Sequence, residues 1–183
     1  MGDKNTGFYG KTTINCRGRL LDLSTPRVMG IINLTPDSFF ADSRHKITDE
    51  LLLSCEKMLT QGADILDLGG VSTRPGAETV TVDDELKRVL PAIEAIAKRF
   101  PEAILSIDTY WAYVAERAVQ AGASIINDIS AGQLDEAMYE TVAKLNVPYI
   151  LMHMQGTPQT MQVNPNYNNV VLDVLSFFEK KID

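Results

Sequence analysis

Five polar residues each follow a short apolar run, and side chains of these types could bind a polar heterocycle or a cation. They are Asn33, Asp67, Asp108, Asn127 and His153. Carboxylate and amide groups can pair with the N–H groups of a heterocycle, and an amide oxygen is also a ligand for a hard cation. Each residue could instead cap a helix or tie down its own loop. His153 has no second histidine near it, so we expect it to pack or hydrogen-bond.

Two polar loops follow the first two runs. Thr35-Pro36-Asp37-Ser38 turns the backbone after Asn33, and Thr73-Arg74-Pro75-Gly76 comes shortly after Asp67. The second loop offers a hydroxyl, a guanidinium and backbone amides, which suit an anionic group. A surface arginine in an ordinary turn explains these four residues equally well. The residues alone therefore indicate a polar, amide- and carboxylate-lined site.

The apolar runs predict strands that alternate with helices. We expect strands at 28–32, 65–68, 104–107, 124–126 and 149–152, with a hairpin inside 12–23 that caps one end of the fold. We expect helices from an N-cap at Thr48 to Gly62, from Thr81 with a kink at Pro91, from Thr109 to Ala121, over 134–145 and over 170–180. This alternation predicts parallel pairing, because each helix serves as a crossover.

Two architectures fit this order: an open doubly wound sheet and a (β/α)₈ TIM barrel. The open sheet usually carries Gly-x-Gly-x-x-Gly after its first strand, whereas Leu-Thr-Pro-Asp follows Asn33 here. A barrel gathers all its strand ends into one mouth and typically needs ~250 residues. We therefore predict an α/β fold in which residues 1–183 form a single domain of about five βα units, a barrel that lacks its C-terminal units.

Composition bounds the partners and the compartment. Lys and Arg number 17 and Asp and Glu number 24, so the formal net charge is −7. An acidic chain argues against broad binding of nucleic acid or an anionic membrane, and no apolar run is long enough to span a bilayer. Cys16 and Cys55 lack metal-ligand spacing and no secretory signal is visible. We therefore expect reduced thiols in a cytoplasmic protein.

Five motifs together resemble the dihydropteroate synthase family. They read Val28-Met-Gly-Ile-Ile-Asn-Leu-Thr-Pro-Asp-Ser-Phe, Asp67-Leu-Gly-Gly-Val-Ser-Thr-Arg-Pro-Gly-Ala, Ser106-Ile-Asp-Thr, Ile126-Asn-Asp-Ile and Leu151-Met-His-Met-Gln-Gly. The resemblance implies a (β/α)₈ barrel, usually a homodimer when full length, and a target of sulfonamides. It also implies condensation of 7,8-dihydropterin-6-ylmethyl diphosphate with 4-aminobenzoate to dihydropteroate and diphosphate in folate biosynthesis, with Mg²⁺.

The same resemblance implies roles for particular residues. Asn33 would bind the Mg²⁺ that accompanies the diphosphate, and Asp108, Asn127 and Arg74 would be the catalytic residues. The substrate-binding residues would be Phe39, Asp67, Thr73, Arg74, Pro75, Asp108, Asn127 and Met152. In this mechanism the diphosphate leaves first, and the aryl amine then captures the pterin methylene cation.

Three departures from the family pattern affect these expectations. Val71 stands where the family usually has Glu, and the first loop is one residue longer, which makes Asp42 its expected carboxylate. The family's later Asp-Pro-Gly segment, pocket lysine and Ser-x-Arg-x-His end are absent from the 183 residues. We therefore predict little or no synthase activity from these residues alone. The alternatives are a pterin-binding methyltransferase domain and a non-catalytic pterin-binding module.

Overall fold

Five parallel strands form one sheet, and each strand is hydrogen-bonded to its neighbours in sequence. The structure, a computed structural model, describes residues 12–34, 44–71 and 80–182. The sheet contains, in spatial order, β3 (Met29–Asn33), β4 (Ile65–Gly69), β5 (Ile104–Asp108), β6 (Ile125–Asp128) and β7 (Tyr149–Leu151). This consecutive order is that of a barrel wall and not of a doubly wound sheet. Within the described part of the chain the sheet does not close.

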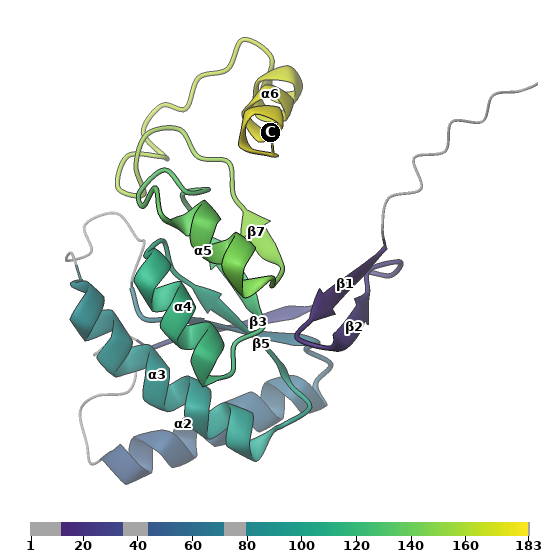
Figure 1. Cartoon of the computed structure of the whole chain (residues 1–183), viewed down its shortest axis with the longest axis vertical. Helices are drawn as coiled ribbons and strands as arrows, with labels where there is room; N and C mark the ends of the chain where they lie inside the picture. The colour runs from purple at the N-terminus through teal and green to yellow at the C-terminus, as the bar shows by residue number, and fades with distance from the viewer. Residues whose placement is uncertain (1–11, 35–43, 72–79, 183) are drawn as a thin grey trace, which may run out of the picture.

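Helices cover one face of this sheet. α2 (Arg44–Thr60), α3 (Val82–Arg99), α4 (Ala112–Ala121) and α5 (Met138–Leu145) lie along that face, while α6 (Val170–Ile182) lies apart from them (Figure 1). The strand residues that point toward the helices are buried with the apolar stripes of α2 to α5; they are Ile32, Leu66, Leu68, Leu105, Ile107 and Ile126. The predicted parallel α/β arrangement is therefore confirmed.

A two-stranded hairpin covers the opposite face of the sheet near the N-terminal ends of the parallel strands. β1 (Thr13–Cys16) and β2 (Arg19–Asp22) pair antiparallel. Their buried side chains pack with inward-pointing residues near the N-terminal ends of the parallel strands: Cys16, Leu21, Ile65, Ile104 and Ile125. At the turn, Arg17 donates from Nη1 to the carbonyl oxygen of Val119 at 2.8 Å, near the C-terminus of α4. The expected role of the hairpin as a cap on one end of the fold is confirmed.

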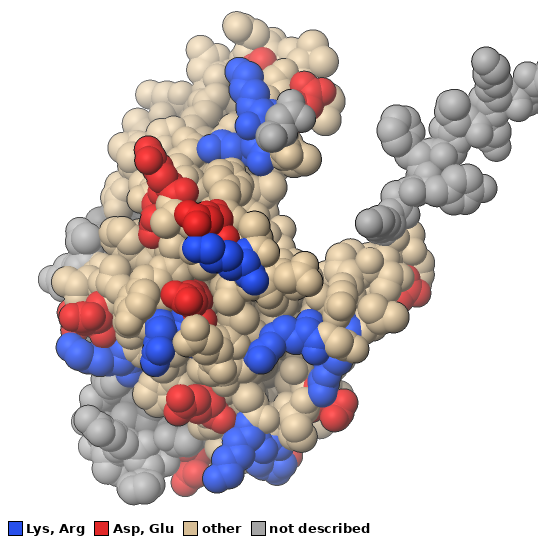
Figure 2. Space-filling view, viewed as in Figure 1, with Lys and Arg blue, Asp and Glu red and all other residues tan. Residues whose placement is uncertain are grey.

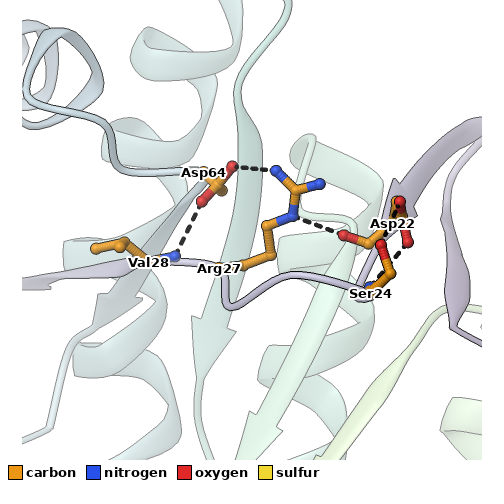
Figure 3. A network of polar contacts seen from close by, with 5 residues as sticks. All are labelled: Asp22, Ser24, Arg27, Val28 and Asp64. Carbon is orange, nitrogen blue, oxygen red and sulfur yellow. Dashed lines mark hydrogen bonds and ion pairs between the residues drawn. The ribbon is translucent and has the colours of Figure 1, made fainter.

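A polar network joins the hairpin to the first strand of the sheet (Figure 3). Arg27 donates from Nε to the Asp22 carbonyl at 2.6 Å and from Nη1 to the Asp64 carboxylate at 3.1 Å. Asp64 also accepts from the Val28 backbone N–H at 2.9 Å, and this bond lowers the pKa of its carboxyl. Because Asp64 directly precedes β4, the network sets where β3 begins beside β4.

Three predicted helix starts are wrong. α2 begins at Arg44, four residues before the predicted N-cap Thr48, and the sequence has no Pro or Gly between these two residues that would end a helix. α4 has Trp111 and not Thr109 at its N-cap. The first N–H of this helix, that of Ala112, donates to the Asp135 carboxylate at 2.8 Å.

The third wrong start is that of α5, which begins at Met138 and not at residue 134. Asp135 again gives the reason, because its other oxygen accepts from the Ala137 N–H at 3.0 Å and holds residues 135–137 in a turn. α3 runs from Val82 to Arg99 through Pro91, with the Thr81 side chain accepting from Asp84 N–H as the capping pattern predicted.

Candidate functional site

Three of the predicted site residues lie in one row across the C-terminal ends of the strands. Asn33 pairs with Gly69, Gly69 with Asp108, and Asp108 with Asn127. Paired residues point to the same side of a sheet, and here that side is opposite to the helices. Gly69 leaves room for its neighbour, because a Cβ atom there would lie 3.3 Å from Asp108 Oδ2. The register therefore brings Asn33, Asp108 and Asn127 together on one face.

Asp67 lies one layer deeper on the same face and orients Asn127. Asn127 Nδ2 donates to Asp67 Oδ2 at 3.0 Å. Asp67 is only 4% exposed, and its Oδ1, like the hydroxyl of its paired neighbour Ser106, has no hydrogen-bond partner among the described residues. With its amide nitrogen committed to Asp67, Asn127 keeps its amide oxygen as an acceptor for a ligand.

The two carboxyl groups of the site hold their protons more tightly than exposed carboxyls do. Burial raises the pKa of Asp108 to about 7, and the charges of Asp67 and Asp128 add to that rise. Burial also raises the pKa of Asp67, while the hydrogen bond from Asn127 opposes the rise. A ligand that donates N–H groups would stabilise the charged form of such a carboxyl.

Asp128 points to the other side of β6 and serves the fold. Its carboxylate accepts from Ser130 N–H at 2.7 Å, Gly132 N–H at 2.8 Å and the Tyr149 hydroxyl at 2.6 Å. With a fourth bond, from the Ser130 hydroxyl, Asp128 holds the loop between β6 and α5 and joins it to Tyr149 of β7. Asn127 and Asp128, adjacent on β6, therefore point to opposite sides of the sheet.

Met152 and His153 follow β7 at the same end of the sheet. The Met152 N–H donates to the Asp128 carbonyl at 3.4 Å, which places Met152 beside the end of β6. The His153 ring packs against Phe177 of α6 with centroids 4.8 Å apart and against Tyr167 at 5.7 Å. This aromatic packing agrees with the expectation that His153 packs.

Several predicted site residues lie outside the described residues. These are Phe39 and Asp42 of the first loop and Thr73, Arg74 and Pro75 of the second. In the described ranges no three His, Cys, Asp or Glu side chains gather where they could hold a metal ion. The Asn33 side chain is exposed at the end of β3, where it offers one amide oxygen to a cation.

Glu85 is the residue that the sequence reasoning missed. It is fully buried on α3, beside the ends of β4 and β5. Its spacing held a signal, because Glu85, Val89 and Ile93 follow one another at four-residue intervals and all three are buried. A carboxyl group that shares the helical spacing of an apolar stripe is buried together with that stripe.

Comparison with known proteins identifies the class. The family model of pterin binding enzymes matches residues 29–183, and the chain belongs to this family. Its curated relatives include the dihydropteroate synthase of Haemophilus influenzae, 48% identical over 163 residues, which are 89% of this chain and 58% of that protein. The dihydropteroate synthase of Escherichia coli is 45% identical over 166 residues, 91% of this chain and 58% of that protein.

Solved structures agree with this assignment. Xanthomonas albilineans dihydropteroate synthase with 4-aminobenzoic acid matches with a TM-score of 0.82 at 42% identity, over 93% of this chain and 60% of that one. Yersinia pestis dihydropteroate synthase with a sulfonamide drug matches with a TM-score of 0.82 at 45% identity, over 93% of this chain and 61% of that one. The chain thus spans about three fifths of the length of these relatives. None of its described helices is both long and apolar enough to cross a membrane.

Proposed function

We propose that this chain supplies the pterin-binding part of a dihydropteroate synthase. The reaction is the condensation of 7,8-dihydropterin-6-ylmethyl diphosphate with 4-aminobenzoate, giving dihydropteroate and diphosphate. The observation that carries the proposal is the row of Asn33, Asp108 and Asn127 at the C-terminal ends of adjacent strands, where barrel enzymes bind their substrates. The relatives named above support the choice of substrates, because their names state this activity.

The polar groups of the row suit the edge of a pterin ring. The Asp108 carboxylate would accept two ring N–H groups, and the Asn127 oxygen would accept a third, since the Asn127 nitrogen is held by Asp67. Asp108 is only partly exposed, which strengthens such bonds. Together Asp108 and Asn127 would bind and orient the ring. Met152, beside the end of β6, would contact it from the next strand.

The chemistry itself needs no nucleophile from the protein. The bond from the pterin methylene to the diphosphate oxygen breaks, and its electron pair leaves with the diphosphate. The aryl amine then forms the new C–N bond and loses a proton to solvent. The resemblance to the family assigns the diphosphate and the aminobenzoate to Thr73, Arg74, Pro75 and Phe39. Arg74 would stabilise the departing charge.

A magnesium ion fits this site as a companion of the substrate. Asn33 offers one neutral oxygen, and Mg²⁺ in proteins commonly takes its remaining ligands from water and substrate phosphates. When bound, the ion would neutralise charge on the diphosphate. We extend the proposal to a cytoplasmic enzyme, homodimeric in its full-length form and sensitive to sulfonamides. The free, buried Cys16 and Cys55 are compatible with a reducing compartment.

The function can be tested by measuring binding and turnover separately. Calorimetry with a 7,8-dihydropterin, with and without Mg²⁺ and diphosphate, should show binding to the 183-residue chain. Asp108→Asn should weaken it at least about tenfold, the loss of roughly 1.4 kcal/mol that a hydrogen bond to a charged group can supply. Asp83→Asn, an exposed change on α3, is the matched control.

Turnover is measured by product analysis with both substrates, beside the Escherichia coli enzyme. We expect the chain to form little or no dihydropteroate. A rate close to that of the longer enzyme would refute this expectation, and cobalamin-dependent methyl transfer would favour the methyltransferase alternative. Pterin binding by the wild-type chain that Asp108→Asn leaves unchanged would contradict the assigned site.

A further inference from the structure

Glu85 is a fully buried carboxyl group that the proposed reaction does not use. It lies in the first turn of α3, and neither of its oxygens has a hydrogen-bond partner in the part of the chain that the structure describes. A Cβ atom at Gly70 would lie 2.9 Å from Glu85 Cγ, so the side chain lies directly behind the end of β4. A charged carboxylate in such a place is costly unless it is paired.

Among the described residues, none supplies a cation that is committed to Glu85. Arg88, one turn along α3, donates from Nη1 to the Gly70 carbonyl oxygen at 2.8 Å. Burial raises the pKa of Glu85 to about 7; the charge of Asp108 adds to this rise, and the charge of Arg88 opposes it. Burial raises the pKa of Tyr110, which follows the end of β5, and the charge of Glu85 adds to that rise.

Glu85 and Asp108 therefore lie on opposite sides of the same strand end. Thr109, the residue after Asp108, is buried toward the helices, where Glu85 lies, whereas Asp108 belongs to the row on the other face. If both carboxyls were charged, each would oppose the charge of the other. Asp108 is partly exposed and can receive N–H groups from a ligand, whereas Glu85 can receive none from outside.

We propose that Glu85 is a positioning residue that stays neutral behind β5, so that Asp108 alone carries the negative charge that meets the ligand. The pterin part of this proposal rests on the proposed function. A neutral Glu85 removes the repulsion that would otherwise keep Asp108 protonated, and its side chain fills the space behind Gly70 that a smaller residue would leave empty. Ionisation of Glu85 at higher pH would then oppose ligand binding.

The first test needs no ligand. Carbon-13 NMR of the wild-type chain, with labelled Asp and Glu carboxyls, follows both groups from about pH 4 to 10. We expect Asp108 to ionise before Glu85. Spectra of Glu85→Gln and Asp108→Asn assign the two signals, and Glu85→Met serves if the amide prevents folding. Ionisation of Glu85 before or together with Asp108 would overturn the proposal.

The second test compares dissociation constants for a 7,8-dihydropterin across pH. The ratio of the wild-type value to the Glu85→Gln value cancels the ligand's own titration. We expect a ratio near one at about pH 6 that rises about threefold by about pH 8.5, because only wild type then carries a charge at Glu85 that opposes the charge of Asp108. Glu94→Gln, on the exposed face of the same helix, should give a flat ratio.

The outcomes separate this proposal from the proposed function. A Glu85→Gln ratio that stays constant with pH would mean that Glu85 only fills space, and the proposal would fail while pterin binding stands. If neither protein binds the pterin, the proposed function fails for this chain. The order of ionisation measured without ligand then decides the role of Glu85 by itself.

Discussion

At the scale of single residues, the site depends on one hydrogen bond that sets the direction of an amide. Asn127 could present either its nitrogen or its oxygen to a ligand, and the bond to Asp67 selects the oxygen. Asp67 makes this choice from a buried position one layer below the row. It therefore acts on a ligand through its neighbour, even if it never touches that ligand.

We predict that Asp67→Asn weakens pterin binding about tenfold, or ~1.4 kcal/mol, because a side-chain amide no longer holds Asn127 in one orientation. Calorimetry at about pH 8 measures the effect. Asp173→Asn on α6, far along the chain from the row, controls for the loss of a carboxylate. Equal affinities of Asp67→Asn and wild type would show that Asn127 is oriented by something else.

A second residue-scale prediction concerns pH and stability. The raised pKa of Asp108 means that the folded chain holds a proton which the unfolded chain releases near pH 4. The contribution of Asp108 to the free energy of unfolding is therefore most favourable at low pH, and it falls as the pH rises from about 4 to 7. We expect the free energy of unfolding of Asp108→Asn to fall by about 2 kcal/mol less than that of wild type over this pH range.

Urea unfolding of both proteins at about pH 4.5 and pH 7.5 measures this difference. Asp83→Asn, whose wild-type side chain is exposed, should retain the wild-type pH dependence. An identical pH dependence in Asp108→Asn and wild type would mean that Asp108 is charged in the folded chain well below neutral pH.

At the scale of elements, helix ends are set by residues that are distant in sequence. The first N–H of α4 is bound by Asp135, 23 residues further along the chain, and the same carboxylate holds the turn before α5. Local capping patterns placed Thr81 correctly, because its partner Asp84 is three residues away. They failed for Thr109, whose hydroxyl accepts instead from Trp111 N–H at 3.2 Å.

We predict that Asp135→Ala lowers the free energy of unfolding by about 1 kcal/mol, the usual cost of losing a helix cap. The loss arises because one substitution leaves the N–H groups of Ala112 and Ala137 without their acceptors. Urea unfolding measures it, and Glu136→Ala, exposed and adjacent, should change the value by less than about 0.5 kcal/mol. Equal effects of the two substitutions would contradict the double capping role.

At the scale of the whole molecule, the described sheet has helices on one face and a hairpin over part of the other. Parallel sheets are normally covered on both faces, yet Ile31 in the first strand is 65% exposed, and its neighbour Ile32 is 3% exposed. α6 carries no buried residue, although it is rich in apolar side chains. In the view of Figure 2, basic and acidic side chains are interspersed over the helical layer.

We predict that Ile31→Thr changes the free energy of unfolding by less than about 0.5 kcal/mol, as expected for an exposed site. Ile32→Thr should cost about 3 kcal/mol, because it leaves a cavity and buries a hydroxyl in the helix-facing core. Urea unfolding of the two variants at low protein concentration makes the comparison. Similar losses would show that the chain covers its inner face in solution, by self-association or with a segment outside the described residues.

The sequence by itself determined the order of strands and helices, the polar residue at each strand end and the family. These features are local, because an apolar run, a capping pattern or a motif is complete within a few residues. Only the tertiary structure decided that Asn33, Asp108 and Asn127 share one row, that Asp128 faces the helices, and that Glu85 lies behind the row. The reason is that register and facing depend on pairing between strands separated by tens of residues in the sequence.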